Sequence, residues 1–329
     1  MKTRKMAANK AINAALREEM YRDDNVYVIG EDVGEFGGIW GATAGLLNEF
    51  GKERVICTPM SEMAFGTMAV ATALMGKRPV VDMMYANFAS IFYESIALEA
   101  AQMRFLSGGK KSVPIVFRGA QGISGGGGAF HSQCVESWFL GRPGLIVMCP
   151  STALDAYGML KTAIRNDNPV LFLENIRLYA DRETVPPVEE NYTVPVGKAR
   201  IFREGTDVTV IASQQMLKLS LRVADEMEEQ GVSTEVIDPR TIWPYDIDTF
   251  CDSARKTGRV IVVHEGYRAG GYGGEYSAAI TERCMKALKA PVTRIGGCNT
   301  VIPAGLLDAH VVPNEEEVRN AIWQLMKSQ

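Results

Sequence analysis

The residue with the clearest capacity for proton transfer follows a run of glycines. His131 comes directly after the segment GISGGGGAF, and the chain has two further histidines at His264 and His310. A neutral imidazole can give or take a proton near pH 7, so a histidine at the start of a predicted helix is a candidate general acid or base. Taken alone, a packing or capping histidine is the more common case, and both interpretations stay open.

Two glycine-rich segments could bring backbone N–H groups to an anion. The run Gly125–Gly128 lacks the Lys-Ser/Thr end of a P-loop and the GxGxxG spacing of a dinucleotide site. It equally suits a loop at the carboxyl end of a strand, where open α/β sheets bind their ligands. The second segment, GYRAGGYGGEYS, precedes a predicted helix and could face an anion or only pack tightly.

A glutamate lies where a predicted strand passes into a predicted helix. In CTPMSEMAFG, Ser61 is placed to cap the helix and Glu62 to occupy its first turn, near the positive end of the helix dipole. Beside Met60, Met63 and Phe65, the same carboxyl would be desolvated, which raises its pKa and keeps a protonated carboxyl available. Spacing alone does not separate these two roles.

Size and composition limit the function classes. The 329 residues exceed what one core usually spans, so we expect two domains. With 47% hydrophobic and 22% charged residues and a net charge of −4, the chain has a globular composition and no basic field for nucleic acid or anionic lipid. The six cysteines form no CxxC pair, which favours buried free thiols in a reducing compartment.

No segment predicts a membrane span or a secretory signal. The longest low-charge run, Phe65–Gly76, is shorter than the roughly 20 apolar residues that a spanning helix needs. Ile12, Leu16 and Met20 recur at helical spacing and predict the first helix of the fold. We expect a cytoplasmic protein, or a mitochondrial matrix protein if the sequence is a processed eukaryotic form.

Helical periods alternate with short apolar runs along the whole chain, which predicts an α/β protein. Runs that are apolar on both faces suit parallel sheets covered by helices on each side. The strands expected in the first half are 26–30, 54–58, 79–85, 113–118, 145–150 and 169–174, and the helices are 61–75, 87–106, 132–140 and 154–166. Those expected in the second half are strands 207–212, 233–238, 260–264 and 292–295, and helices 216–230, 275–288 and 315–326.

The hydrophobic period stops in the proline-containing stretch ETVPPVEENYTVP. We therefore predict two doubly wound α/β domains, residues 1–182 and 197–329, joined by a linker at 183–196.

Several motifs then coincide in order over nearly the whole chain. They are GEDVG at 30–34, TAGL at 43–46, TPMSE at 58–62, SGGK at 107–110, VPIVFRG at 113–119, HSQ at 131–133, PGL at 143–145, DPRT at 238–241 and KTGR at 256–259. In these the chain resembles the β subunits of the E1 components of thiamine-diphosphate-dependent 2-oxo acid dehydrogenases, the family of pyruvate, branched-chain and acetoin dehydrogenases. The resemblance implies a transketolase-type pyrimidine-binding domain followed by a transketolase C-terminal-type domain.

The resemblance also implies roles for individual residues. Glu62 matches the glutamate that holds N1′ of the cofactor aminopyrimidine, and Phe88 matches the aromatic that stacks on the pyrimidine. Glu31, Met60 and Met84 match other positions of that pocket.

His131 matches a histidine near the thiazolium that is suited to proton transfer during reductive acylation of a lipoyl group. The backbone carbonyls of five residues match a K⁺ site: Ile115, Ala163, Ile164, Asn166 and Asn168.

Thiamine enzymes generally hold the diphosphate and Mg²⁺ through a GDG motif followed by Asn, and the chain contains no GDG. The resemblance therefore implies an α subunit that holds that half in an α2β2 heterotetramer, and an E2 lipoyl acyltransferase core as a further partner.

The chain departs from the family pattern at a few positions. Glu94-Ser95 replaces the usual Asp-Gln, Leu98 the usual Asn and Pro239 a leucine, and Phe130 precedes the histidine. These changes leave the substrate open between pyruvate, a branched-chain 2-oxo acid and acetoin. The changes at Glu94, Ser95 and Leu98 also motivate one alternative, a non-catalytic assembly or regulatory subunit of such a complex. A further alternative is a fragment of a transketolase-like or deoxyxylulose-phosphate-synthase-like enzyme.

Overall fold

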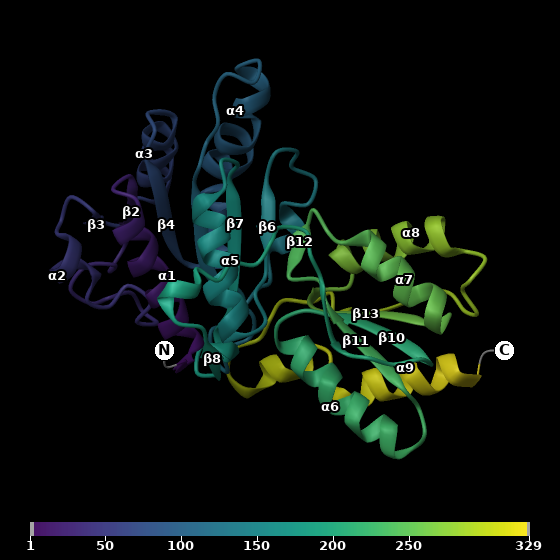
Figure 1. The fold of residues 1–329 in the computed structure, drawn as a ribbon. Coiled ribbons are helices and arrows are strands. Elements are labelled where there is room, and N and C mark those ends of the chain that lie inside the picture. The colour runs from purple at the N-terminus through teal and green to yellow at the C-terminus, as the bar shows by residue number, and fades with distance from the viewer. Residues whose placement is uncertain (1–2, 328–329) are drawn as a thin grey trace. The chain divides into compact units, whose positions relative to one another are not determined.

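The chain folds into two compact units, which are described separately. The structure is a computed structural model that describes residues 3–327 (Figure 1). The first unit comprises the chain up to Gln121 together with Trp138–Val196, and the second comprises Gly122–Ser137 together with the chain from Gly197 onward. Both are built on largely parallel sheets flanked by helices, so the predicted α/β class is confirmed.

The first unit is built on a parallel sheet. Its strands lie in the order β6-β7-β5-β4-β2-β3. Every residue of β2, β5, β6 and β7 is buried, as expected for strands covered on both faces. The bounds are β2 Val26–Gly30, β3 Val55–Cys57, β4 Arg78–Tyr85, β5 Val116–Gln121, β6 Ile146–Met148 and β7 Val170–Asn175.

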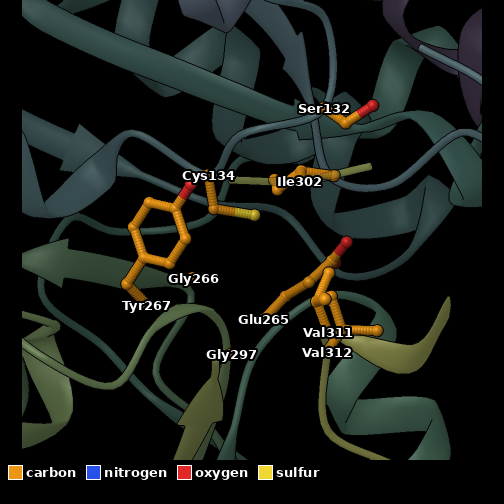
Figure 2. A pocket seen from close by; sticks show the side chains of 9 residues that line it. All are labelled: Ser132, Cys134, Glu265, Gly266, Tyr267, Gly297, Ile302, Val311 and Val312. Atoms are coloured by element: carbon orange, nitrogen blue, oxygen red, sulfur yellow. The ribbon is translucent and has the colours of Figure 1, made fainter. Parts of the chain in front are cut away.

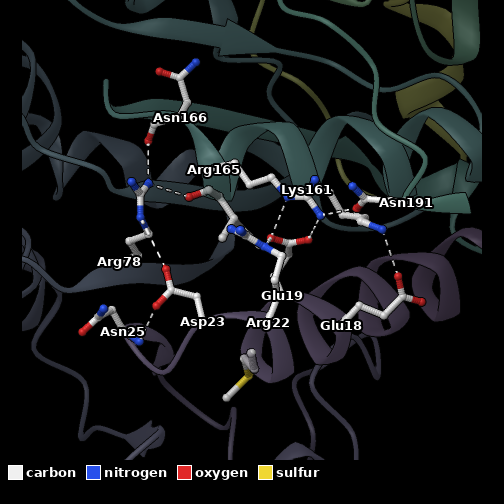
Figure 3. Close-up of polar contacts among 12 residues, drawn as sticks. Glu18, Glu19, Arg22, Asp23, Asn25, Arg78, Lys161, Arg165, Asn166 and Asn191 are labelled. Atoms are coloured by element: carbon white, nitrogen blue, oxygen red, sulfur yellow. Dashed lines mark hydrogen bonds and ion pairs between the residues drawn. The ribbon is translucent and has the colours of Figure 1, made fainter. Parts of the chain in front are cut away.

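Helices α1 (Ala8–Arg22) and α5 (Ala153–Arg165) pack together over one face of this sheet. Ion pairs join them: the Arg165 guanidinium donates to both carboxylate oxygens of the buried Glu19, at 2.6 and 2.9 Å, and Lys161 Nζ donates to Glu18 (Figure 3). The opposite face is covered by α3 (Glu62–Leu74), where the ring of Phe65 contacts Phe92 and Phe92 contacts Phe117 of β5.

The helix predicted over 87–106 is broken into three pieces. A 3₁₀ segment, η1 (Ala86–Ser90), is followed by a π-helix, η2 (Glu94–Ala100), and by α4 (Ala101–Leu106). The π segment packs closely on α3, because a side-chain carbon at Gly66 would lie 2.8 Å from the Phe92 ring and 3.0 Å from Ser95 Oγ. Helical periodicity in the sequence does not distinguish these hydrogen-bonding patterns.

Two more predictions for this half are wrong in detail. Residues 132–140 do not form a helix, and only Glu136–Trp138 form a 3₁₀ turn, η4; His131 therefore begins no helix. The segment instead bonds to the second unit's own elements, as Ser137 Oγ accepts from the Tyr272 N–H. Strand β5 also begins later than expected, because Pro114 has no N–H to donate to a neighbouring strand.

Within the predicted linker, residues up to Val185 are part of a strand. Arg182–Val185 form β8, which pairs antiparallel with β1 (Arg4–Ala7), and Val188–Glu190 form a 3₁₀ turn, η6. A short helix, α2 (Leu46–Phe50), and the 3₁₀ turn η5 (Ile176–Leu178) complete the first unit. The predicted division into domains stays a prediction; the compact units also separate after Val196, but group residues 122–137 with the second.

The second unit contains a sheet in the order β14-β13-β10-β11-β9, with only the edge strand β9 antiparallel. Its strands are β9 Arg200–Arg203, β10 Val208–Ala212, β11 Thr234–Asp238, β12 Thr241–Trp243, β13 Val260–Tyr267 and β14 Thr293–Gly297. Its helices are α6 Gln215–Glu229, α7 Ile247–Thr257, α8 Tyr272–Cys284 and α9 Glu315–Lys327, with 3₁₀ turns η3 Gly128–Phe130 and η7 Gly305–His310.

Helix α7 was not predicted, although its ends carry recognisable signals. The Asp246 side chain accepts from the Thr249 N–H at the N-terminus, and Gly258 ends the helix with a φ of 72°. The expected burial of the cysteines holds for Cys149, Cys251 and Cys284, whereas Cys57 and Cys298 are exposed and all six are free thiols. Among the described residues, no helix is long and apolar enough to cross a membrane.

Candidate functional site

The predicted pyrimidine pocket lies at the carboxyl edge of the first unit's sheet. Glu31 follows β2, Glu62 begins α3 just beyond β3, and Met84 lies near the carboxyl end of β4. Because β2 is parallel to both β3 and β4, the carboxyl ends of these strands meet at one edge. Gly30 permits this close approach, since a side-chain carbon there would lie 2.6 Å from the Asp82 carbonyl oxygen.

Two carboxyl groups, those of Glu31 and Glu62, lie close enough at this edge to interact electrostatically. Burial raises the pKa of Glu31 above its ordinary value, and the negative charges of Glu62 and Asp32 raise it further, while a backbone hydrogen bond from Ser61 opposes the shift. Ser61 lies at the N-cap position of α3, but its hydroxyl donates to the Pro59 carbonyl rather than capping the helix. Glu62 is therefore a half-buried carboxyl at a helix N-terminus, close enough to Glu31 to influence its protonation.

Unpartnered polar atoms mark the same edge. Glu31 Oε1 and Thr58 Oγ1 are buried and have no hydrogen-bond partner among the described residues. A buried polar atom without a partner costs free energy of roughly 1–3 kcal/mol, so such atoms are expected where a ligand completes the bonding. An aminopyrimidine, with its ring nitrogens and amino group, offers both the donors and the acceptor that these atoms need. The residues present fit the cofactor that the family resemblance implies.

The apolar members of the predicted pocket lie on nearby turns. Met84 has a left-handed backbone with φ of 65°, which is unusual for a residue with a side chain. The Asp82 carboxylate stabilises this turn, since Oδ1 accepts from the Met84 N–H at 2.9 Å. Phe88 is half-buried in η1 with its ring edge-to-face to Tyr85, whereas the Met60 side chain is 87% exposed.

A buried ion network supports the Met84 turn. The Arg118 guanidinium pairs with Asp82 on one side and donates from Nε to Glu174 Oε1 at 2.7 Å on the other, and the Tyr179 hydroxyl donates to Glu174 Oε2 at 2.5 Å. The opposite charges raise the pKa of Arg118 although its burial acts in the other direction, so the guanidinium stays charged. Asp82, Arg118 and Glu174 come from the adjacent strands β4, β5 and β7. The network therefore ties the Met84 turn to three strands of the sheet.

His131 belongs to the second unit, unlike Glu31, Met60, Glu62, Met84 and Phe88, which belong to the first. It follows η3, is half-buried, and its N–H donates to the Gly128 carbonyl. The neighbouring Phe130 side chain is 78% exposed. The prediction that the glycine run is a loop beyond a strand is confirmed, since β5 ends at Gln121.

The residues of the predicted K⁺ site come from the last turn of α5 (Ala163 and Ile164), from the loop to β7 (Asn166 and Asn168), and from Ile115 just before β5. The Arg78 guanidinium donates from Nη1 to the Asn166 carbonyl at 3.1 Å (Figure 3). It also donates from Nη1 to the Ile164 carbonyl at 3.0 Å. Ile115 O accepts from the Val170 N–H, and Ala163 O from the Asn166 N–H. Each of these oxygens has a second lone pair, so the K⁺ site stays a prediction.

Sequence reasoning missed Thr58, Asp82, Arg118 and Glu174. Thr58 is part of the TPMSE motif, but the sequence pattern predicted no role for it. The other three are charged residues within strands that are largely apolar, and such a residue needs a partner when it is buried. That signal could have identified these residues as members of a charged network. It does not reveal which strands are neighbours in the sheet.

Comparison with known families matches both halves of the chain. Residues 4–181 match the transketolase pyrimidine-binding domain, and residues 197–318 match the transketolase C-terminal domain. A split-gene transketolase, described as an inactive β4 tetramer, superimposes with a TM-score of 0.78 over 98% of this chain and 99% of its own at 22% identity. Transketolase from Campylobacter jejuni superimposes with a TM-score of 0.72 over 98% of this chain and 47% of its own, at 18% identity. These likenesses establish the fold.

Relatives of higher identity define the family. The mitochondrial pyruvate dehydrogenase E1 component subunit β of Pisum sativum is 42% identical over 97% of this chain and 89% of its own length. In Bacillus subtilis, the pyruvate dehydrogenase E1 component subunit β is 41% identical over 95% of this chain and 96% of its own, and the 2-oxoisovalerate dehydrogenase subunit β is 40% identical over 96% and 97%. The chain therefore belongs to the family of E1 β subunits of 2-oxo acid dehydrogenase complexes.

Proposed function

We propose that this E1 β subunit holds the aminopyrimidine half of thiamine diphosphate at the carboxyl edge of its first sheet. The observation that carries the proposal is the pair of unpartnered buried atoms, Glu31 Oε1 and Thr58 Oγ1, in a place where the Glu62 charge acts on Glu31. When bound, thiamine diphosphate supplies the nucleophilic carbon and the electron sink for cleaving the bond beside a 2-oxo group.

The chain's own residues bind and orient the ring. The Glu62 carboxyl would hold N1′ of the pyrimidine by a shared proton, and Phe88 would stack on the ring. Glu31 retains its proton to higher pH than an ordinary glutamate, because burial and the Glu62 charge raise its pKa, and it can then donate a hydrogen bond. Met60 and Met84 supply apolar contacts that exclude water.

His131 serves the second half of the reaction. Transfer of the acyl unit to a lipoyl group of E2 requires proton transfer at the dithiolane, and a half-buried imidazole is suited to that task. The substrate is a small 2-oxo acid. Since the pyruvate and 2-oxoisovalerate enzymes of one organism are 41% and 40% identical to this chain, overall similarity does not choose between their acyl groups, and acetoin stays a further candidate.

The diphosphate half of the cofactor belongs to a partner. The chain has no GDG motif, so an α subunit carrying that motif holds the diphosphate and Mg²⁺ in an α2β2 heterotetramer. The carbonyls around Ile164 and Asn166 are the proposed K⁺ site. E2 lipoyl domains are the acceptors of the acyl group.

Reconstitution with an α subunit tests the cofactor assignment. The chain and its α partner are co-purified, and thiamine diphosphate affinity and decarboxylation with an artificial electron acceptor are measured for Glu62→Ala. We expect the rate to fall by about 10² to 10⁴, the range for a general acid or base. Glu53→Ala, at an exposed glutamate in the loop before β3, is the matched control and keeps its rate.

Near-normal turnover of Glu62→Ala would exclude the proposed role of the glutamate. A wild-type heterotetramer that assembles but neither binds thiamine diphosphate nor decarboxylates any 2-oxo acid would instead support the assembly subunit. The departures Glu94 and Leu98 favour testing that alternative, since both side chains are exposed on η2.

A further inference from the structure

The loop that carries His131 has little intrinsic stiffness. Gly122, Gly125, Gly126 and Gly128 all have φ between 62° and 158°, a backbone region that favours glycine. Glycine loses more conformational freedom on folding than any other residue, so a run of glycines holds one conformation only if other groups fix it. A histidine that must meet a substrate atom needs such fixing, because a misplacement of about 1 Å can cost about 10² in rate.

Two carboxylates from distant parts of the second unit hold this loop. Glu265 Oε1, in β13, accepts from the Ile123 N–H at 2.7 Å. Asp308 Oδ2, in η7, accepts from the Gly125 N–H at 2.8 Å, and the Asp308 residue is only 1% exposed. Hydrogen bonds to an ionised acceptor are roughly twice as strong as neutral ones. One bond lies just before the glycine run and the other at its first residue, so both hold its N-terminal end.

The C-terminal side of the loop rests on the same elements. Ser132 and Cys134 line a cavity together with Glu265, Gly266, Tyr267, Gly297, Ile302, Val311 and Val312 (Figure 2). Its volume is about 10 Å³, which is room for one water molecule at most. Gly266 lies against the loop, since a side-chain carbon there would be 3.1 Å from Glu136 Oε1 and 3.3 Å from Cys134 Cβ. His131 is therefore bracketed by fixed points on both sides.

We propose that Asp308 and Glu265 are positioning residues for His131: their carboxylates fix the glycine run so that the imidazole is presented for acyl transfer. This inference rests on the proposed function, because it takes the role of His131 in reductive acylation as given. Glu265 also lies in the wall of the cavity beneath the loop, so Asp308 is the cleaner test of the pair.

The role predicts an effect on one partial reaction. In the reconstituted complex, Asp308→Ala should slow single-turnover acylation of a lipoyl domain by about 10 to 100-fold, while decarboxylation with an artificial acceptor stays within about twofold. Asp308→Asn keeps an oxygen that can accept from Gly125, so it should recover a large part of the acylation rate. Asp252→Ala, at an exposed aspartate of α7 in the same unit, is the matched control and should change neither rate.

Hydrogen exchange supplies a readout that is independent of activity. Amides of residues 123–131 should exchange faster in Asp308→Ala, while those of β10 and β13 stay protected as in the wild type. Equal loss of both partial reactions, or loss of protection throughout the second unit, would mean that Asp308 only stabilises the fold and would overturn the proposal.

A His131→Gln variant separates this proposal from the function on which it rests. If His131→Gln acylates the lipoyl domain normally, the proposed role of the histidine fails, whatever Asp308→Ala does. If His131→Gln is slow but Asp308→Ala is normal in acylation and exchange, the histidine keeps its role and the positioning proposal fails alone.

Discussion

The glutamate edge of the first unit and the histidine loop of the second are held in place by different means. Glu62 starts a helix beside parallel strands, and the adjoining Met84 turn is tied to three strands by the charges of Asp82, Arg118 and Glu174. His131 follows a glycine run whose position depends on hydrogen bonds from backbone N–H groups to Glu265 and Asp308. The glutamate site is thus held mainly by the sheet, whereas the histidine site depends on a small number of hydrogen bonds.

This difference suits the two partial reactions. Under the proposed function, the cofactor needs a constant pocket through every turnover, which residues anchored to several strands of the sheet provide. Under the same proposal, a lipoyl group arrives and leaves on another protein, so the loop must present His131 in the same position at each encounter, which the bonds from Ile123 and Gly125 support. Changes to the first region should therefore act on stability and cofactor binding, and changes to the second on acyl transfer.

The largest expected effect on stability comes from the ion network of the first unit. Arg118→Met leaves Asp82 and Glu174 buried without their common partner, so the free energy of unfolding should fall by about 3–5 kcal/mol. Urea unfolding of the purified chain measures this loss. Arg255→Met removes an exposed pair with Asp252 and should change stability by less than about 1 kcal/mol.

A loss for Arg118→Met as small as that of the control would mean that the network adds little, and the contrast between the two regions would weaken. Affinity for thiamine diphosphate in the reconstituted complex gives a second readout, since loosening the Met84 turn should lower it while leaving acylation of pre-loaded enzyme less affected.

The second expected effect is a pH dependence of the free energy of unfolding, caused by His264 in the sheet of the second unit. Burial lowers the pKa of His264 to about 4, and the Arg294 charge acts in the same direction, although Nδ1 contacts the Gly266 carbonyl at 3.0 Å. The unfolded chain binds this proton near pH 6.5, so stability is fully present above that pH and falls as the pH drops toward 4. The loss should approach about 3 kcal/mol at pH 4.

Denaturant unfolding at pH 7, 5.5 and 4 measures this slope. His264→Gln, which has no titratable ring, should be less stable at pH 7 but should lose less on acidification. An equal pH dependence in the wild type and the variant would show that His264 is not the group responsible.

The smallest expected effect comes from a substitution at Gly266, which packs against Cys134 and Glu136 next to the histidine loop. Gly266→Ala forces Glu136 or Cys134 to move by a few tenths of an ångström, which should slow lipoyl acylation by about threefold or less, with decarboxylation unchanged. Gly274→Ala in α8 is the control, because its new carbon would meet only the end of the Arg294 side chain and helical alanine is favoured. Slowed decarboxylation in Gly266→Ala would contradict the separation of the two regions.

Much of this organisation can be predicted from the sequence. The α/β class and most strands follow from apolar runs such as 26–30 and 208–212, which are buried throughout in the structure. The positions of Glu62 at a helix start and of the glycine run beyond a strand also follow from local pattern. These features depend on neighbours in the sequence.

The remainder depends on partners distant in the sequence. Local pattern does not reveal that Asp308 bonds to Gly125, or that Arg118 lies between Asp82 and Glu174. The helix expected at 132–140 fails for the same reason, since Cys134 and Glu136 pack against Gly266 and Ser137 Oγ accepts from the Tyr272 N–H. The π segment at 94–100 reflects close packing on Gly66, which periodicity does not record.

The most direct test of the central claim measures the two partial reactions side by side in Glu62→Gln and His131→Gln, each reconstituted with the α subunit. If the first region serves the cofactor and the second serves acyl transfer, Glu62→Gln should lose decarboxylation and acylation together, by about 10² or more, whereas His131→Gln should lose only acylation. Equal losses of both reactions in both variants would contradict the account.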